Sequence, residues 1–461
     1  MTLAPLSEPI DVDAIVSGDA AFNLAHYCLR RAAQITPEKS ALEVVANLSD
    51  ATPSETWTYQ SIEDAVLRVA GGLLARGFQP GHRVVIRLDN TSTYPILFLG
   101  CIAAGLVAIP ASSQLTAAEA QFMLADSGAS AVAVASHLPR GELPPGLTLL
   151  HEDDIRTMMR AAPRAGYAVT RANDAAYLIY TSGTTAHPKG VVHAHRVVLG
   201  RRPMYQGWYA ITPDDRMLHA GAFNWTYTLG TGLIDPWANG ATSLIYTGEK
   251  SPEVWPALIR HCNATLFAAV PSLVRQILKY APSGPLDVHR LRHGLIAGER
   301  PPDDLFDAWR QRTGTELHEA LGMSELSTYI STKVHGNITC KMLIVDTDAM
   351  IDGGIIADDV VIRGVTRGII RARRVRLERT AEVEGELFQE MFSAEEGAKV
   401  RGQLRELNDG QAQGHSVSLA TSTVAMPPDL SPLPQSQPAN TFYQRLDAAR
   451  AAHATPQSPS R

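Results

Sequence analysis

The sequence is poor in lysine and cysteine and has no excess of positive charge. Its 461 residues include 41 Lys and Arg against 47 Asp and Glu, which gives a formal net charge of -6. Such a balance lacks the basic footprint that nucleic-acid binding usually requires, so we expect no nucleic-acid partner. With 45% hydrophobic and 19% charged residues, the chain has enough apolar material for two or three domains, and a wholly disordered chain is excluded.

The few cysteines form no CxxC or Cys/His ligand spacing, so a zinc site is not expected. Cysteines set far apart in apolar or mixed stretches are typical of free thiols in a reducing compartment. The first residues, MTLAPLSEPIDVD, carry acids where a signal peptide would have a basic segment before an apolar run. These features predict a cytoplasmic protein. The cysteines are Cys28, Cys101, Cys262 and Cys340.

Long uninterrupted apolar runs are also missing. No charge occurs between Asp89 and Glu119, but two prolines and two glycines interrupt the stretch. A spanning helix needs about 20 continuous apolar residues. We therefore predict no membrane span here, but a buried helix at about 94–105 followed by a buried strand, LVAIP.

Between Ala41 and about Thr332, helical patterns alternate with short strands rich in Val, Ile and Ala. Examples are SIEDAVLRVAGGLLARG before HRVVIRL, AAEAQFMLADSG before SAVAVAS, and VWPALIRHCN before TLFAAV. This alternation is typical of βα units that stack into a mostly parallel sheet with helices on both faces. The predicted fold class is α/β, with mixed-to-parallel sheets layered with helices.

From about Gly336 to Leu407 the helical signal is replaced by short, alternating β-like runs. Glycine recurs before an apolar pair or its equivalent at Gly354, Gly368, Gly385 and Gly402. Successive glycines are 14, 17 and 17 residues apart. A nearly fixed period favours a solenoid, in which each coil buries its apolar face against its neighbours. An ordinary β-meander is the alternative.

The last segment, residues 408–461, is rich in Pro, Ser and Gln. Such a composition cannot bury enough apolar surface to offset chain entropy. We predict a disordered tail.

One of only seven lysines, Lys189, lies in the most specific segment of the chain, Tyr180-Thr-Ser-Gly-Thr-Thr-Ala-His-Pro-Lys-Gly-Val192. The segment follows the apolar run AAYLIY and precedes an expected helix near His195. Hydroxyls, backbone N–H groups and one cation at a strand end suit a polyphosphate. The candidate phosphate-binding residues are Thr181, Ser182, Gly183, Thr184, Thr185 and Lys189.

This loop resembles the phosphate signature of the adenylate-forming enzymes, which include acyl-CoA synthetases, luciferases and peptide-synthetase adenylation domains. Two further segments agree with that family in the expected order, LIAGERPP at 295–302 and EALGMSE at 319–325. The resemblance covers about residues 15 to 332. It implies ATP and Mg²⁺ as cofactors, a small-molecule carboxylate as substrate, and CoA as one acceptor open to the enzyme.

The resemblance also assigns roles to the two later segments. It places Ser324 near the α-phosphate and Glu325 on Mg²⁺, an ion that prefers hard oxygen ligands. Ser324 stands in place of the commoner Thr, and Leu321 replaces an aromatic that stacks on adenine in many members. A solvated loop acid is the alternative for Glu325. The residues implied to bind adenine or AMP are Gly298, Glu299, Glu319, Ala320, Leu321, Gly322 and Ser324.

The stretch 221–230 is similar to the acyl-pocket segment of synthetases acting on medium-chain or aromatic carboxylates. By resemblance, Phe223, Asn224, Trp225 and Tyr227 face the substrate. A core role for the same aromatics is equally open, since Trp and Tyr commonly pack with one polar atom satisfied.

Three histidines, His187, His193 and His195, surround the phosphate loop. Their spacing does not make a metal site, and a histidine near phosphate is more often a surface or capping residue. We expect no catalytic role for them.

The family likeness ends near residue 332. A complete member would continue with a Tyr-x-x-Gly-Asp segment, a hinge and a C-terminal domain whose Lys stabilises the transition state. The sequence after 332 holds only Lys333, Lys341 and Lys399, none in that context. Losing a transition-state cation and a ribose anchor costs several kcal/mol of barrier, so a thousandfold or larger loss of rate is expected.

Residues 353–407 instead resemble bactofilins, bacterial polymer-forming cytoskeletal proteins with a right-handed β-helix that assembles end to end. About four coils can be counted. A basic run, Arg371 to Arg379, lies among several glutamates, so a self-compensated solvated face is more consistent with it than a membrane or nucleic-acid site.

Two functions follow. The first is an ATP-using, acyl-adenylate-forming protein, impaired because its C-terminal domain is missing. The second is a cytoskeletal assembly protein that carries an inactive synthetase lobe and self-assembles through the β-helix. The expected domains are the synthetase-like lobe at 1–332, the bactofilin-like β-helix at 333–407 and the tail at 408–461.

Overall fold

The computed structural model describes most of the chain between residues 20 and 407. The described residues are 15, 20–50, 52–139, 142–181, 188–299, 301–302, 304–322, 329–331, 333–335, 338–339, 342–345 and 349–407. The predicted tail, 408–461, lies outside them. Within these ranges no helix is long and apolar enough to cross a membrane.

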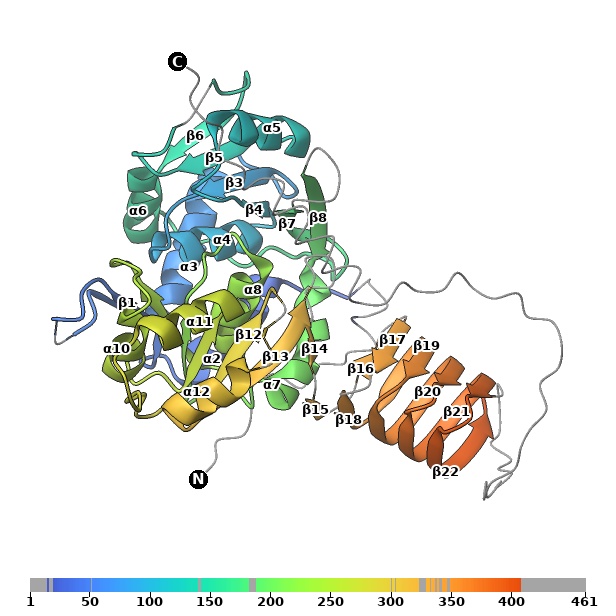
Figure 1. The fold of residues 1–461 in the computed structure, drawn as a ribbon. Helices are drawn as coiled ribbons and strands as arrows, with labels where there is room; N and C mark the ends of the chain where they lie inside the picture. Colours follow the sequence, from blue (N-terminus) through green and yellow to red (C-terminus); the bar gives the residue numbers. More distant parts are fainter. Residues whose placement is uncertain are drawn as a thin grey trace, which may run out of the picture. The chain divides into compact units, whose positions relative to one another are not determined.

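The first lobe sheet has six strands in the order β6-β5-β3-β4-β7-β8 (Figure 1). All neighbours pair in parallel except β7 and β8, which form an antiparallel hairpin. The strands are β3 (Arg83–Arg87), β4 (Val107–Pro110), β5 (Ala131–Val134), β6 (Thr148–His151), β7 (Ala175–Thr181) and β8 (Lys189–Ala194).

Four helices accompany this sheet, and their ends follow local sequence signals. The side chains of Thr116 and Glu119 form a capping box at the start of α5, and Gly128 ends the helix in the left-handed conformation at φ +58°. Helix α4 is buried along its whole length, which confirms the predicted buried helix and following strand. The helices are α3 (Tyr59–Ala75), α4 (Thr93–Ala103), α5 (Ala117–Ser127) and α6 (Glu152–Ala161).

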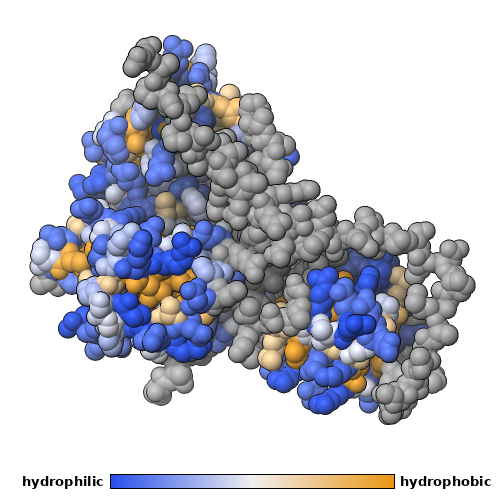
Figure 2. Space-filling view, in the orientation of Figure 1, coloured by the Kyte–Doolittle hydropathy of each residue, from blue (hydrophilic) through white to orange (hydrophobic). Residues whose placement is uncertain are grey.

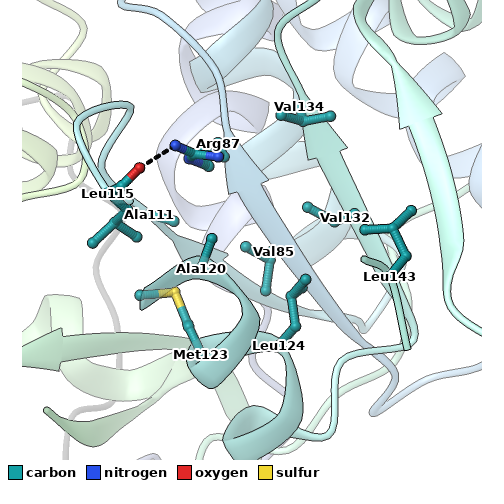
Figure 3. A pocket seen from close by; sticks show the side chains of 10 residues that line it. All are labelled: Val85, Arg87, Ala111, Leu115, Ala120, Met123, Leu124, Val132, Val134 and Leu143. Carbon is teal, nitrogen blue, oxygen red and sulfur yellow. Dashed lines mark hydrogen bonds between the residues drawn. The ribbon is translucent and has the colours of Figure 1, made fainter. Parts of the chain in front are cut away.

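Apolar side chains of α5 pack on this sheet around one buried cation, Arg87 (Figure 3). The Arg87 guanidinium, 2% exposed, donates hydrogen bonds to the carbonyl oxygens of Leu115, Pro139 and Ser112. The cavity beside it measures about 10 Å³, about the room that a single water needs. It is therefore a packing feature of the core and has no room for a ligand.

The second lobe sheet has eight strands in the order β14-β13-β12-β11-β9-β10-β1-β2. Its six central strands run parallel, and the outer strands β14 and β2 pair antiparallel. The strands are β1 (Ser40–Val45), β2 (Glu55–Thr58), β9 (Arg216–His219), β10 (Thr242–Tyr246), β11 (Leu266–Ala269), β12 (His293–Ala297), β13 (Glu316–Gly322) and β14 (Tyr329–Ser331).

Helices cover both faces of the second sheet, which confirms the α/β class predicted from the alternating patterns. Met217 and Leu218, neighbours on β9, enter different apolar clusters, so each face of the sheet has its own core. The helical elements are α2 (Leu24–Ile35), η1 (His195–Arg201), α7 (Arg202–Gly207), α8 (Thr226–Leu229), the π-helix η2 (Gly230–Ile234), α9 (Asp235–Ala238), α10 (Val254–His261), α11 (Pro271–Tyr280) and α12 (Leu305–Thr313).

The repeat region forms a parallel β-helix, which confirms the solenoid and excludes the meander. Its register joins Lys333, Met350, Val365, Glu382 and Lys399 in one ladder, with repeats of 17, 15, 17 and 17 residues. The ladder has one coil more than the four counted in the sequence. The strands are β15 (Lys333–His335), β16 (Ile338–Thr339), β17 (Met342–Val345), β18 (Met350–Asp352), β19 (Ile355–Ile362), β20 (Val365–Leu377), β21 (Glu382–Ala394) and β22 (Lys399–Glu406).

A column of glycines marks the same corner of successive coils. Gly368, Gly385 and Gly402 lie side by side in the register, and a side chain on Gly368 would meet the carbonyl oxygen of Gly353 at 2.2 Å. The sequence had placed Gly354 in this column. That assignment was wrong by one residue, because Asp352 pairs with Arg367 and so brings Gly353 opposite Gly368.

The basic run of the β-helix is compensated by acids, as predicted, but the acids come mostly from neighbouring coils. Arg373 lies 3.3 Å from Glu390, Arg376 lies 3.0 Å from Glu395, and Arg374 is paired with Asp359. Figure 2 shows hydrophilic side chains over most of the visible face of this segment. Exposed pairs of this kind contribute about 0–1 kcal/mol each, so they favour solubility more than stability.

Candidate active site

The two strands that flank the predicted phosphate loop, β7 and β8, form a hairpin. Thr181, the last residue of β7, pairs with Lys189, the first residue of β8, across an antiparallel hairpin. Lys189 is exposed at this end of the hairpin. The intervening candidates Ser182, Gly183, Thr184 and Thr185 lie outside the described residues. Strand β8 follows the loop, and the helical turn η1 begins at His195, where a helix was expected.

A hydrogen bond anchors the strand that leads into this loop. The Tyr180 hydroxyl donates to Asp126 at 2.6 Å, from the end of β7 to the last turn of α5. Burial, with the Asp126 carboxylate as a further cause, raises the pKa of Tyr180, so the phenol remains a donor. The hairpin that carries Thr181 and Lys189 is thus joined to helix α5 by a hydrogen bond.

The predicted adenine segment follows β12 directly. Gly298 adopts φ +98°, a left-handed conformation that favours glycine and turns the chain at the strand end. The Glu299 carboxylate then accepts a hydrogen bond from the backbone N–H of Ser272 in the first turn of α11. Since the first N–H groups of a helix lack partners within it, Glu299 caps α11 and fixes the turn.

The second adenine segment ends the neighbouring strand. Ala297 of β12 pairs in parallel with Ala320 of β13, so Gly298, just after β12, and Gly322, the last residue of β13, lie at the same edge of the sheet. Glu319 precedes Ala320 on β13 and pairs with Ile296. Leu321 pairs through its backbone with Ile330. Two candidates, Ser324 and Glu325, fall outside the described residues, as does the side chain of Leu321.

The acyl segment lies at this same edge, after β9. Phe223 and Tyr227 are buried, whereas the Trp225 side chain is 55% exposed. The Tyr227 hydroxyl donates to the carbonyl oxygen of Leu295 at 2.9 Å, and the Phe223 ring lies 5.4 Å from the Tyr94 ring. The structure thus brings the acyl segment beside β12, with Asn224 between these anchors and half-buried.

Sequence reasoning missed Asn90, which joins the two lobe sheets at the site. Its amide nitrogen donates to the carbonyl oxygen of Gly221 at 2.9 Å, and its amide oxygen accepts from the N–H of Phe223 at 3.1 Å. The side chain therefore brackets the start of the acyl segment from the loop after β3. The only signal in the sequence was its place three residues after the end of an apolar strand.

His219, also missed, supports the acyl segment from the end of β9. Its Nδ1 accepts the N–H of Gly221 at 2.9 Å, and its ring meets the Tyr227 ring edge-on at 4.5 Å. Burial lowers the pKa of His219 to about 3, so the ring is neutral near pH 7. With Nδ1 as acceptor, the neutral ring carries its proton on Nε2.

The histidines near the phosphate loop have structural contacts. His195 is fully buried and accepts the N–H of Leu24 through Nδ1 at 3.1 Å, and burial lowers its pKa to about 4. His193 stacks on Tyr177 with ring centroids 4.6 Å apart. His187 is not described. In the described part of the chain no group of three or more His, Cys, Asp or Glu side chains could hold a metal.

The β7–β8 hairpin, which flanks the predicted phosphate loop, thus belongs to the six-stranded sheet. The acyl segment and the two adenine segments lie at the carboxyl edge of the eight-stranded sheet. In open α/β sheets ligands bind at this edge. A family model described as AMP-binding enzyme matches residues 29–353. The chain belongs to the AMP-binding enzyme family. That match covers both lobe sheets and every described candidate residue.

Curated relatives of this chain include two ligases for aromatic acids. A 4-hydroxybenzoate–CoA/benzoate–CoA ligase of Rhodopseudomonas palustris is 32% identical over 304 residues, 61% of this chain and 55% of the relative. A benzoate–CoA ligase of Thauera aromatica is 29% identical over 288 residues, 59% of this chain and 54% of the relative. The chain thus spans about half the length of the curated relatives it matches.

Solved structures agree with the fold of the lobe. A benzoate CoA ligase from Burkholderia xenovorans superposes with a TM-score of 0.61 at 26% identity, covering 68% of this chain and 63% of that protein. The N-terminal subdomain of Klebsiella oxytoca NpsA, in complex with 3-hydroxybenzoyl-AMSN, has a TM-score of 0.58 at 20% identity. It covers 67% of this chain and 74% of that protein.

A second family model, Bactofilin, described as polymer-forming cytoskeletal, matches residues 314–405 of the chain. It includes the whole parallel ladder from β15 to β21 and most of β22. The two matches overlap over residues 314–353. The change of sheet falls inside the overlap, between Ser331 of β14 and Lys333 of β15.

Proposed function

We propose that the chain binds ATP and an aromatic carboxylate and forms an acyl adenylate slowly. The observation that carries this proposal is the hydrogen bond from Tyr227 to Leu295, which joins the acyl segment to β12. This hydrogen bond joins the buried side chain of Tyr227 to β12 at Leu295, which precedes Gly298 and Glu299, the residues proposed for adenine, by three and four residues. The aromatic acids named for two relatives support the substrate class.

In the proposed reaction one carboxylate oxygen attacks the α-phosphorus of ATP. A carbon–oxygen–phosphorus linkage forms, the bond from the α-phosphorus to the bridging oxygen of the β-phosphate breaks, and pyrophosphate leaves. Lys189 at the hairpin mouth, with Thr181, Ser182, Gly183, Thr184 and Thr185, would hold the polyphosphate. Mg²⁺ on Glu325 would neutralise phosphate charge. The adenine set would be Gly298, Glu299, Glu319, Ala320, Leu321, Gly322 and Ser324.

We propose that the reaction is slow because neither Lys333 nor Lys399, the lysines after residue 332 among the described residues, lies in a segment that resembles the family's transition-state lysine. Lys399 lies on the β-helix, where its ammonium contacts the Glu382 carboxylate at 2.6 Å. Lys333 is on the first coil of the same β-helix. Without a cation on the transferring phosphoryl group, a loss of a thousandfold or more in rate is expected. CoA remains the proposed acceptor, with inefficient thioester formation.

The experiment pairs binding with turnover. Titration calorimetry with ATP and with a hydroxybenzoyl-adenylate analogue should show binding that Lys189→Ala weakens at least tenfold and that Lys279→Ala, an exposed Lys on α11, leaves unchanged. Exchange of labelled pyrophosphate into ATP should be weak over a panel of aromatic acids. Binding unaffected by Lys189→Ala would contradict the phosphate site. Robust exchange would contradict the impairment.

Assembly through the β-helix is the second proposed activity, supported by the bactofilin match and the parallel ladder. Under this proposal residues 1–332 form the synthetase lobe, 333–407 the assembling segment and 408–461 a disordered tail, in a cytoplasmic protein. Electron microscopy and light scattering of the purified chain test it.

A further inference from the structure

A second cavity, of about 500 Å³, lies between helix α6 and strand β2. The first turn of α3 and the start of α4 also line it. Its volume is in the range of small-molecule sites, about 300–1,000 Å³. None of its lining residues belongs to the sets proposed for phosphate, adenine or substrate. The lining residues are Glu55, Thr56, Trp57, Ser61, Ser92, Thr93, Arg156, Met159 and Arg160.

One wall of this cavity is an aromatic ring held by a hydrogen bond. Trp57 is half-buried against the apolar core, and its Nε1 donates to Oε2 of Glu55 at 2.9 Å. The Ser92 hydroxyl donates to the same oxygen. Among the described residues no donor contacts the other oxygen, Oε1, which is therefore left as an acceptor for a ligand. The Trp57 ring and Met159 supply apolar surface on which an aromatic ring can pack.

The wall formed by α6 carries two guanidinium groups. Arg156 and Arg160 are four residues apart on this helix, so they lie on one face of it. Arg156 is paired with Glu152 at 2.9 Å, whereas Arg160 has no ion pair among the described residues. A guanidinium can bind a carboxylate through two parallel hydrogen bonds. Arg160 is therefore the cation that an anionic ligand in the cavity can use.

The cavity also contains an unpaired hydroxyl. Thr93, the first residue of α4, is 1% exposed and lines the cavity. Its hydroxyl has no hydrogen-bond partner within the part of the chain that the structure describes. Leaving a buried hydroxyl unpaired is unfavourable, so a polar ligand group beside Thr93 would be stabilising.

We propose that this cavity binds an aromatic carboxylate whose ring carries a hydroxyl or amino group. The carboxylate pairs with Arg160, and the ring packs on Trp57 and Met159. The hydroxyl or amino group donates to Oε1 of Glu55. A second carboxylate at that position would be repelled by Glu55, which excludes dicarboxylates. The site is additional to the one proposed for adenylation, so binding there requires no ATP.

Titration calorimetry of the full chain with 4-hydroxybenzoate tests the proposal. One equivalent of a hydroxybenzoyl-adenylate analogue is added first, so that the proposed adenylation site is filled. We expect one further 4-hydroxybenzoate to bind to each chain. Arg160→Ala should weaken this binding by about tenfold or more, because the carboxylate loses its charged partner. The uncharged 4-hydroxybenzamide should bind to the wild type more weakly than 4-hydroxybenzoate by about the same factor.

The matched control is Arg260→Ala, which should leave the binding unchanged. Arg260 also lies in the last turn of a helix, α10, with 67% of its side chain exposed, and does not line the cavity. No binding after the analogue is added, or equal affinities of wild type and Arg160→Ala, overturns the proposed site. If the analogue itself does not bind, the proposed adenylation site fails, whereas 4-hydroxybenzoate binding that depends on Arg160 still supports the cavity.

Discussion

The hydroxyl of Tyr227 donates a hydrogen bond of 2.9 Å to the backbone carbonyl oxygen of Leu295, which joins the acyl segment to β12. The phenol also lies 3.4 Å from the carbonyl oxygen of Ala269 on β11. Three residues after Leu295 the chain turns at Gly298 toward the proposed adenine pocket. Strand β12 therefore positions both the Tyr227 side chain and the turn at Gly298.

Tyr227→Phe should separate carboxylate binding from nucleotide binding. The variant keeps the ring against His219 but loses the hydrogen bond, which costs about 1 kcal/mol of stability. We expect a several-fold weaker affinity for an acyl-adenylate analogue and an unchanged affinity for ATP, both from titration calorimetry. Tyr280→Phe, at a ring on α11 that is 51% exposed, is the control and should change neither. An equal loss for ATP would argue against an acyl role.

The glycine column predicts a sharp intolerance in the β-helix. Gly385 has φ +139°, and a Cβ there would lie 1.9 Å from the carbonyl oxygen of Gly368. Gly385→Ala should therefore destabilise this segment by about 3 kcal/mol or more, measured by urea unfolding. Gly314→Ala is the matched control, since Gly314 also has a left-handed φ, +72°, but nothing lies within 4 Å of its Cβ position. A similar small loss in both would show that the column accommodates a methyl group.

Much of the fold could be predicted because local patterns decided it. Apolar residues at helical spacing predicted the helices α3, α5 and α10. Short Val-, Ile- and Ala-rich runs predicted the strands β3, β5 and β11. The Gly353 column shows the limit of such patterns. Two adjacent glycines, Gly353 and Gly354, fit the repeat in sequence, and only the pairing of Asp352 with Arg367 selects between them.

The site residues that were missed have no local signature. Asn90 reaches the acyl segment from 131 residues earlier in the chain, and a single Asn after a strand fits many roles. His219 is one residue at a strand end, and its contacts come from the return of the chain at Tyr227. Contacts between distant segments depend on sheet order, which the sequence did not specify.

Three histidines with lowered pKa values predict acid instability. Burial lowers the pKa of His195 to about 4 and the pKa values of His219 and His293 to about 3. Each is neutral when folded but binds a proton near pH 6.5 when unfolded, so stability is full above pH 6.5 and falls as pH decreases toward these values. For His293, which is 6% exposed, the loss from pH 6.5 to 5 is about 2 kcal/mol.

Urea midpoints measured between pH 7.5 and 5 test this prediction. His293→Phe removes one titrating group. The decrease in unfolding free energy with falling pH should therefore be less steep by about 1.4 kcal/mol per pH unit. A stability that stays constant down to pH 5 would contradict neutral burial of these rings.

The last prediction concerns the ion pair behind the acyl segment. Arg201 and Asp235 lie 2.6 Å apart with side chains 1% and 0% exposed, and the Tyr209 hydroxyl donates to the same carboxylate. The pair joins η1 to the residue that follows the π-helix η2, and the guanidinium packs so closely on Gly230 that a Cβ there would lie 2.2 Å from it. It therefore holds the turn that carries Tyr227.

Arg201→Met alone should cost about 3–5 kcal/mol of unfolding free energy, because it leaves the Asp235 carboxylate buried and unpaired. Adding Asp235→Leu should restore most of this loss, since both charges are then removed and an apolar pair of similar volume remains. Urea unfolding of the four chains gives the coupling energy. If the double variant loses as much as the two single variants together, the pair contributes no coupling, and the turn is held by packing against Gly230 alone.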